Sequence, residues 1–137
     1  PHFMVRRSGH YVTISSVTGK FGTPYRAAYA ASKHTLHGFF DSLRAEVWQD
    51  GITVTMVCPG FIKTTPHALT GNGTPLTHEE QSAYTGKSPQ WLAQKIISAI
   101  RHKKEEVYLG GREVLGVYIK RFFPRHFSRI IRKVAVR

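Results

Sequence analysis

Short apolar runs that alternate with longer amphipathic segments are the feature that most constrains how this 137-residue chain can fold. Residues 10–16, 52–58 and 106–109 are rich in β-branched and apolar side chains, and we predict that they form strands. Helical periodicity follows the first run as far as about Trp48, and it follows the second run from Pro89 onward. Strands that alternate with helices of this length favour a parallel sheet, so the predicted fold class is α/β.

The helix expected after the first strand carries Tyr29 and Lys33, which are four residues apart. Residues at this spacing lie on one face of a helix with Cβ atoms about 5 to 6 Å apart, so the ammonium can lie beside the phenol. A positive charge at that distance favours the phenolate and lowers the phenol pKa from its usual value of about 10. The pair is a candidate proton donor. The alternative, common for Tyr and Lys at this spacing, is a packed ring beside a solvated amine with no chemical role.

The same helix shows an apolar stripe that continues the face of the Tyr29 and Lys33 pair, and we expect this stripe to pack on the sheet. The stripe consists of Leu36, Phe40, Leu43 and Val47. We expect the other faces to hold His37, Asp41, Arg44 and Trp48.

Two hydroxyl groups, those of Ser15 and Ser16, end the first predicted strand, and a loop rich in Gly and Thr leads from them to the helix. Ligands of open α/β sheets bind at the carboxyl ends of the strands. We therefore expect a serine hydroxyl, the Tyr29 phenol and the Lys33 ammonium to converge on one crevice there.

Ser16, Tyr29 and Lys33 resemble the catalytic signature of the short-chain dehydrogenases/reductases, whose spacing selects Ser16 rather than Ser15. A second block, Pro59–Gly60 and the residues after it, is similar to the Pro-Gly turn of that family. The resemblance implies an NAD(P)-dependent oxidoreductase that interconverts a carbonyl and a secondary alcohol.

The resemblance also implies a role for each site residue. Tyr29 would act as general acid and base, Ser16 would orient the carbonyl oxygen, and Lys33 would stabilise the tyrosinate and bind the nicotinamide ribose. The residues expected to contact the cofactor are Tyr29, Lys33, Pro59, Gly60, Ile62 and Thr64.

The resemblance covers nearly the whole chain and implies that residues 1–111 are the carboxyl-terminal half of a Rossmann-like, doubly wound domain, with a substrate lid at about 64–87. The glycine-rich pyrophosphate turn of the family does not occur in this sequence. We therefore expect the 137 residues alone to be catalytically inactive. The cofactor is expected to be NAD or NADP, with NADP slightly favoured. Both are named because the residues that select between them lie in the family's other half.

The net charge of +12 is concentrated near the carboxyl end, where residues 101–137 hold eleven Lys or Arg and three Asp or Glu. Residues 112–137 are predicted to be a basic amphipathic tail in two helical pieces separated by Pro124. Its second piece carries an apolar row formed by Phe127, Ile130, Ile131 and Val134. Such a row suits an anionic membrane surface or an apolar groove of the protein, and both alternatives remain open.

A basic membrane-surface or nucleic-acid module, in which the Tyr29 and Lys33 pair is incidental, is the alternative from a different functional class. Nucleic-acid binding is not expected, because most of the excess charge, +8 of +12, lies in the last 37 residues instead of being spread over the chain. The expected partners are a small-molecule carbonyl or alcohol and, from the family, a second copy of the chain. We expect a cytoplasmic location, with membrane contact restricted to the tail.

The single cysteine, Cys58, excludes an intrachain disulfide, and its place in an apolar strand predicts a buried thiol. His34 and His37 lie three residues apart on the predicted helix, but no Cys, Asp or Glu is expected beside them. The sequence therefore predicts no metal site.

Overall fold

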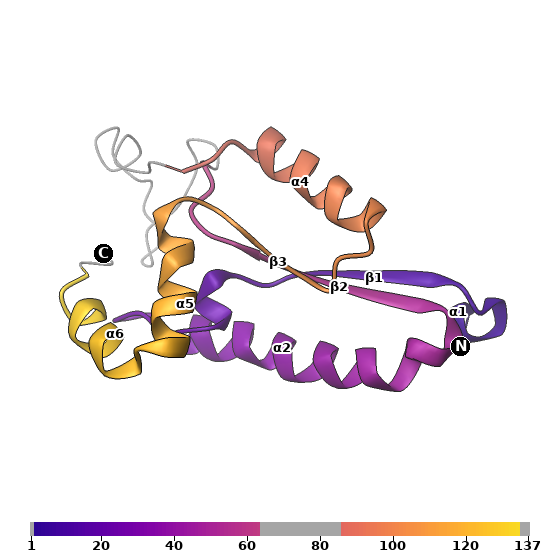
Figure 1. Cartoon of the computed structure of the whole chain (residues 1–137), viewed down its shortest axis with the longest axis horizontal. Coiled ribbons are helices and arrows are strands. Elements are labelled where there is room, and N and C mark those ends of the chain that lie inside the picture. Colours follow the sequence, from indigo (N-terminus) through magenta and orange to yellow (C-terminus); the bar gives the residue numbers. More distant parts are fainter. Residues whose placement is uncertain (1, 64–85, 135–137) are drawn as a thin grey trace.

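The computed structural model describes residues 2–63 and 86–134. Its centre is a three-stranded parallel sheet in the order β1-β2-β3, as Figure 1 shows. The strands are β1 (Gly9–Ile14), β2 (Ile52–Pro59) and β3 (Glu106–Leu109). The predicted α/β fold with a parallel sheet is confirmed.

Helices connect the strands and extend the chain beyond the last one. Helix α2 lies between β1 and β2, α4 lies between β2 and β3, and two further helices follow β3. The helices are α1 (His2–Arg6), α2 (Ala27–Val47), α4 (Pro89–Arg101), α5 (Leu115–Phe122) and α6 (Pro124–Ile131), with 3-10 turns η1 (Val17–Gly19), η2 (Trp48–Asp50) and η3 (Arg112–Val114).

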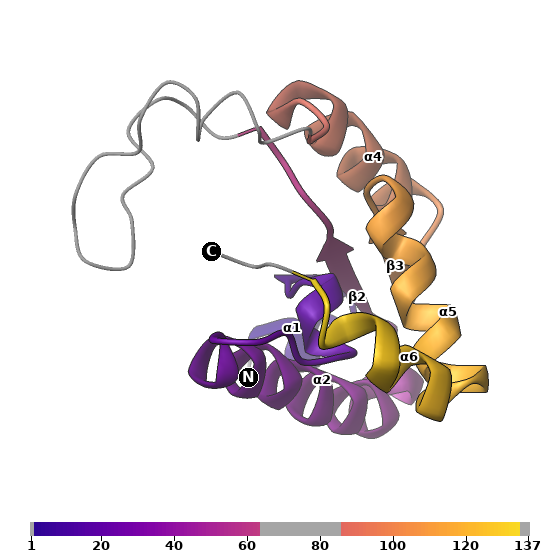
Figure 2. The same cartoon turned by 90° about the vertical axis from the view of Figure 1, so that its left-hand side faces the viewer.

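Helices α2 and α4 lie on opposite faces of the sheet, as Figures 1 and 2 show. Both connections move the chain one strand in the same direction across the sheet, from β1 to β2 and from β2 to β3. Two such connections through opposite faces have opposite hands, so one of them has the left-handed form that occurs in only about 2% of parallel crossovers. This arrangement leaves the face of β3 opposite α4 to be covered by other parts of the chain.

Local sequence signals mark the ends of the helices. The Ser88 hydroxyl accepts a hydrogen bond from the backbone N–H of Trp91 and caps α4, which begins at Pro89. Beyond α2 and η2 the chain turns at Gly51, which has φ +68°, and a Cβ there would lie 2.5 Å from the Arg7 carbonyl oxygen. Only glycine fits this turn without strain.

The central strand β2 forms the core. Its residues Val54, Met56, Val57 and Cys58 are almost fully buried, as expected of a strand covered on both faces. Val54 and Ile52 pack against residues of the predicted stripe of α2, namely Phe40, Leu43 and Val47.

A second core cluster lies at the carboxyl ends of the strands. It joins Val17 and Phe21, which follow β1, to Val117 of α5 and Phe127 of α6. The rings of Phe21 and Phe127 lie 5.0 Å apart between centroids. Phe127 and Ile131 of the apolar row thus pack on the protein itself, as in one of the two predicted alternatives, whereas Ile130 and Val134 are 43% and 41% exposed.

Two residues of α2 were assigned to the wrong face by the sequence pattern. His37 is buried, and Arg44 is half-buried. The Arg44 guanidinium donates hydrogen bonds to the carbonyl oxygens of Val54 and Glu105, which lie in and beside the sheet. Polar side chains can face a sheet when they find such partners, and hydrophobic periodicity alone cannot reveal this.

Most of the predicted lid, residues 64–85, lies outside the described residues. Among the helices of the described ranges, none is both long and apolar enough to cross a bilayer. Within the same ranges β1 pairs with β2 alone, so its outer edge has no neighbouring strand there.

The two methionines test the assignment of the core. Met56 is 0% exposed and Met4 is 45% exposed, so the same substitution samples both environments. We expect Met56→Ala to lower the free energy of unfolding by about 2–5 kcal/mol, because it removes buried apolar volume. Urea denaturation measures this change. Met4→Ala should change the free energy by less than about 1 kcal/mol, and equal losses in the two variants would contradict the assigned core.

Candidate active site

Ser16 lies just beyond the carboxyl end of β1, where it caps η1. Its hydroxyl accepts a hydrogen bond from the Thr18 backbone N–H at 3.1 Å and donates one to the Pro59 carbonyl oxygen at 3.4 Å. These contacts follow from the parallel pairing of β1 with β2, which ends both strands at the same edge of the sheet. The hydroxyl is therefore fixed in place by backbone groups of two segments.

Tyr29 lies in the first turn of α2, and Lys33 lies one turn later. The Lys33 Nζ lies 5.7 Å from the centroid of the Tyr29 ring, and it donates a hydrogen bond to the Ile14 carbonyl oxygen at 3.1 Å. The positive charge is thus held between the aromatic ring and the end of β1. Tyr29 remains 43% exposed, so its ring is accessible from outside the protein.

A cavity of about 380 Å³ brings these elements together. Ser16, Tyr29 and Gly60 line one part of it, and charged side chains of Arg26, Arg112 and Glu113 line another. The remaining wall is largely apolar and includes Val17, Phe21, Phe61, Leu115, Ile119, Phe127, Ile130, Ile131 and Val134.

The turn after β2 holds the other residues predicted to bind a cofactor. Pro59 ends β2, and the Gly60 N–H donates to the Leu109 carbonyl oxygen at 2.8 Å. Ile62 forms an isolated parallel bridge with Lys87, which ties this segment to the chain before α4. Gly60 lines the cavity and Ile62 does not, while Thr64 lies outside the described residues.

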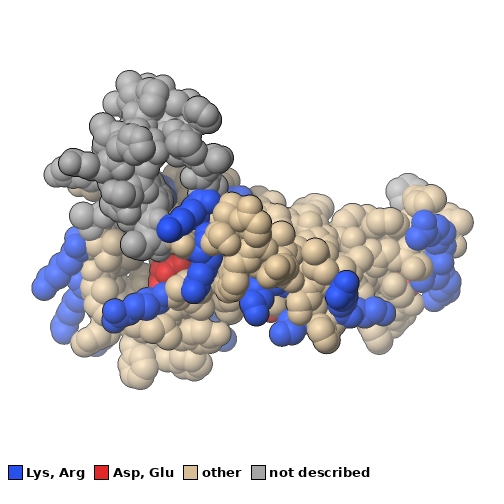
Figure 3. All heavy atoms as spheres, turned by 90° about the horizontal axis from the view of Figure 1, so that it is seen from above, with Lys and Arg blue, Asp and Glu red and all other residues tan. Residues whose placement is uncertain are grey.

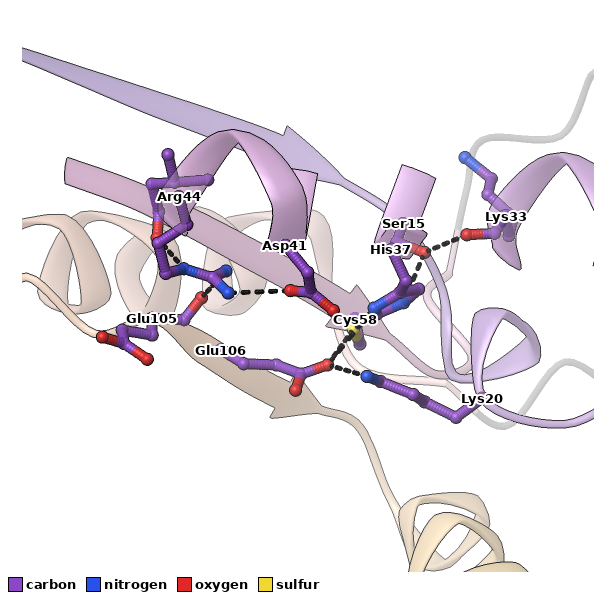
Figure 4. A network of polar contacts seen from close by, with 10 residues as sticks. Ser15, Lys20, Lys33, His37, Asp41, Arg44, Cys58, Glu105 and Glu106 are labelled. Atoms are coloured by element: carbon purple, nitrogen blue, oxygen red, sulfur yellow. Dashed lines mark hydrogen bonds and ion pairs between the residues drawn. The ribbon is translucent and has the colours of Figure 1, made fainter. Parts of the chain in front are cut away.

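A polar network joins the end of β1 to α2 and β2, and Figure 4 shows its residues. The Ser15 hydroxyl donates to the Lys33 carbonyl oxygen at 3.2 Å and lies 3.1 Å from His37 Nε2. His37 Nε2 in turn lies 3.7 Å from Cys58 Sγ. The network therefore ties the strand end that carries Ser16 to the helix that carries Tyr29.

The expectation that no Cys or Glu lies beside His37 was wrong. His37, Cys58 and Glu106 bring potential metal-ligand atoms within 4.8 Å of one another. However, the Lys20 ammonium lies 2.7 Å from Glu106 Oε1 and already supplies a positive charge to this carboxylate. Burial raises the pKa of the Cys58 thiol to about 12, which keeps the sulfur protonated and a poor ligand. We therefore assign no metal to this cluster.

Several residues of the cavity wall were not predicted from the sequence. Glu113 and the apolar residues of α5 and α6 belong to the segment that sequence patterning treated as a separate tail. Their amphipathic spacing predicted the helices, but it carried no information about the surface that they contact. Only the fold places Phe127 opposite Phe21 and beside the site.

Comparisons with known proteins identify relatives of this chain. The family model of the short chain dehydrogenases matches residues 1–72. "Dehydrogenase/reductase SDR family member 7B" of Bos taurus is 42% identical over 134 residues, which are 96% of this chain and 41% of the relative. "Dehydrogenase/reductase SDR family protein 7-like" of Drosophila melanogaster is 39% identical over 140 residues, covering 100% of this chain and 43% of the relative. The chain spans about two fifths of the length of these relatives.

Solved structures show the same fold. A short chain dehydrogenase from Burkholderia cenocepacia in complex with NADP matches with a TM-score of 0.71 at 18% identity, over 90% of this chain and 47% of that one. A short-chain dehydrogenase from Streptomyces avermitilis matches with a TM-score of 0.66 at 22% identity, over 96% of this chain and 55% of that one. The chain therefore belongs to the short-chain dehydrogenase family, a family of oxidoreductases with a Rossmann-like fold.

Proposed function

We propose that the protein is an NAD(P)-dependent oxidoreductase that interconverts a carbonyl and a secondary alcohol. The observation that carries this proposal is the meeting of Ser16 and Tyr29 at one cavity, with the Lys33 ammonium beside the Tyr29 ring. A hydrogen-bond donor and a proton donor that face the same space are what a carbonyl oxygen needs as it gains negative charge.

In the proposed mechanism, the Tyr29 hydroxyl donates its proton to the substrate oxygen during reduction and takes it back during oxidation. Ser16 orients that oxygen through its hydroxyl. Lys33 stabilises the tyrosinate electrostatically and binds the nicotinamide ribose. The alcohol product thus retains one proton from Tyr29, and the tyrosinate is reprotonated from solvent.

The residues at the cavity fit a nicotinamide cofactor, which supplies or accepts the hydride when it is bound. The cavity volume is within the range of small-molecule sites, and it opens at the carboxyl ends of parallel strands, where such folds bind ligands. Pro59, Gly60, Ile62 and Thr64 are proposed to hold the nicotinamide ring. The NADP bound by the Burkholderia cenocepacia structure supports a dinucleotide here, and the choice between NAD and NADP slightly favours NADP.

The apolar wall of the cavity suggests the chemical character of the substrate. Phe21 and Phe127 bring their rings together where α6 covers the groove, and neither ring offers a hydrogen bond. A substrate whose carbonyl lies at Ser16 and Tyr29 would extend along this wall. We infer a carbonyl compound with a substantial apolar portion.

We also propose two contacts of the protein surface. Phe39 and Trp48, on and just after α2, are exposed and are available to a second copy of the chain in a homo-oligomer. Phe122, the last residue of α5, and Phe123, which follows it, are 70% and 66% exposed and are flanked by basic residues. Figure 3 shows Lys and Arg side chains along the molecule, including the end that carries α5 and α6.

No Asp or Glu occurs after Glu113, whereas Lys and Arg recur in both tail helices. Exposed aromatic rings among positive charges complement an anionic bilayer. The rings enter the headgroup region, and each Lys or Arg near the surface contributes about 1 kcal/mol to the free energy of binding. We propose that the tail contacts a membrane surface and that the protein is located in the cytoplasm.

The proton-donor assignment predicts the effect of removing one oxygen atom. Tyr29→Phe in the full-length protein should lower kcat for carbonyl reduction by at least about 100-fold, because the ring is kept and the proton donor is lost. NADPH consumption with a panel of apolar ketones measures the rate. Tyr25→Phe is the matched control, since Tyr25 is exposed and lies nearby, and it should leave the rate unchanged. Normal turnover by Tyr29→Phe would refute the assignment.

The absence of a glycine-rich turn from the sequence predicts weak cofactor binding by these 137 residues alone. Titration calorimetry with NADPH and NADH should give dissociation constants at least about 100-fold higher than those of the full-length protein. Submicromolar binding by the 137 residues would contradict this expectation and would show that the described cavity suffices.

The tail surface predicts binding to anionic vesicles. Replacement of Phe122 and Phe123 by Ser should reduce sedimentation of the protein with phosphatidylserine vesicles by at least about 5-fold. The reason is that the two aromatic rings proposed to enter the bilayer are removed. Val5→Ser is the control, since Val5 is an exposed apolar residue on α1 and belongs to neither proposed contact. Binding that is unchanged by the tail substitutions, or that requires DNA instead of vesicles, would refute the membrane assignment.

A further inference from the structure

Glu113 joins two chain segments that are distant in the sequence. It lies in η3, and its Oε1 atom accepts hydrogen bonds from the backbone N–H groups of Phe61 and Gly111, both at 2.9 Å. Phe61 belongs to the turn after β2, and Gly111 follows β3. A single carboxylate oxygen therefore connects the ends of two neighbouring parallel strands.

Three glycines leave the space that this carboxylate fills. A Cβ added at Gly60 would collide with Oε1, and one added at Gly110 would lie 2.5 Å from the same atom. A Cβ at Gly111 would lie 2.9 Å from Oε2, and its other close neighbours would also be atoms of Glu113. Both turns are thus shaped closely around one side chain.

The contacts of Glu113 are well suited to hold a turn. One side-chain oxygen accepts both N–H groups, so the contacts depend on the position of that oxygen atom. The Gly60 N–H already donates to the Leu109 carbonyl oxygen, so the Glu113 bond to Phe61 N–H fixes the next peptide along the turn. Loss of the carboxylate would leave two backbone N–H groups without this acceptor.

We propose that Glu113 is a positioning residue for the nicotinamide end of the cofactor site. This inference rests on the proposed function, in which Pro59 and Gly60 border the nicotinamide ring. Glu113 acts by fixing the peptide after Gly60, and through it the backbone that faces the cofactor. Its loss should weaken cofactor binding more than it slows proton transfer, since Tyr29 and Lys33 are held by other contacts.

Two substitutions at this position separate geometry from charge in the full-length protein. Glu113→Ala removes the acceptor, whereas the side-chain oxygen of Glu113→Gln can accept both N–H bonds. We expect Glu113→Ala to raise KM for NADPH by about 10-fold with kcat changed by less than about 3-fold, and Glu113→Gln to stay within about 3-fold of wild type in both. Glu105→Ala is the matched control, because the Glu105 side chain is exposed and this residue accepts hydrogen bonds through its backbone carbonyl oxygen.

Hydrogen exchange gives a readout that needs no substrate. Amide exchange of residues 59–63, followed by mass spectrometry, should be at least about 10-fold faster in Glu113→Ala than in wild type and should be restored in Glu113→Gln. If Glu113→Ala does not fold, Gly111→Ala provides a second route. The three atoms nearest to the added methyl all belong to Glu113. By displacing the carboxylate, the methyl should speed amide exchange of residues 59–63 and raise KM for NADPH, as in Glu113→Ala.

The outcomes distinguish this inference from the proposed function. Wild-type amide exchange and a wild-type KM for NADPH in Glu113→Ala would overturn the inference. An equal rise in KM in Glu113→Gln and Glu113→Ala would also overturn it, because it would indicate a role for the charge itself. A fall in thermal stability without a change in KM or in exchange of residues 59–63 would reduce Glu113 to a structural residue. If the wild-type protein bound neither NADPH nor NADH, the proposed function would fail, and the exchange experiment would still decide whether Glu113 holds the turn.

Discussion

The parallel pairing of β1 with β2 is the interaction on which the rest of this structure depends. The register places Ile14 opposite Val57, and the next residue, Ser15, donates its backbone N–H to the Val57 carbonyl oxygen at 2.8 Å. The same pairing brings the Ser16 hydroxyl within hydrogen-bonding distance of the Pro59 carbonyl oxygen. A slip of one residue would turn every side chain of β1 to the other face and remove this contact.

The helix that carries Tyr29 is held against this edge by polar contacts as well as by apolar packing. Lys33 Nζ donates to the end of β1, and the Ser15 hydroxyl donates to the Lys33 carbonyl oxygen. Burial lowers the pKa of His37, so its ring is neutral near neutral pH and fits among buried groups. Gly19 leaves room for this packing, since a Cβ there would lie 2.6 Å from the Ser15 hydroxyl and 2.8 Å from His37 Nε2.

Local signals in the sequence were sufficient to predict most of the secondary structure. The strand 106–109 was predicted with its observed bounds, and Ser88 caps α4 as its position before Pro89 indicated. These features depend on neighbouring residues, which a single sequence displays directly. The two helices of the tail and their separation at Pro124 were also predicted for this reason.

Contacts between distant segments could not be predicted in the same way. The partners of His37 are Ser15, Cys58 and Glu106, which lie on three different strands or their ends, and no local pattern marks them as neighbours. The sequence pattern assigns Arg44 to a solvated face of its helix, and only the fold places carbonyl groups of the sheet beside it. Glu113 likewise acquires its contacts only when β2 and β3 are aligned.

The return of the tail to the body changes where substrate selection is expected to reside. Phe127 packs on Phe21 directly beside the Ser16 and Tyr29 cavity, so α6 serves as both a structural cover and a wall of the site. Under the proposed function, Ser16, Tyr29 and Lys33 would carry the chemistry, whereas the tail would shape the wall that faces the rest of the substrate. The exposed Phe122 and Phe123 belong to the same tail as this wall, so the proposed membrane contact would bring the cavity toward apolar substrates dissolved in a bilayer.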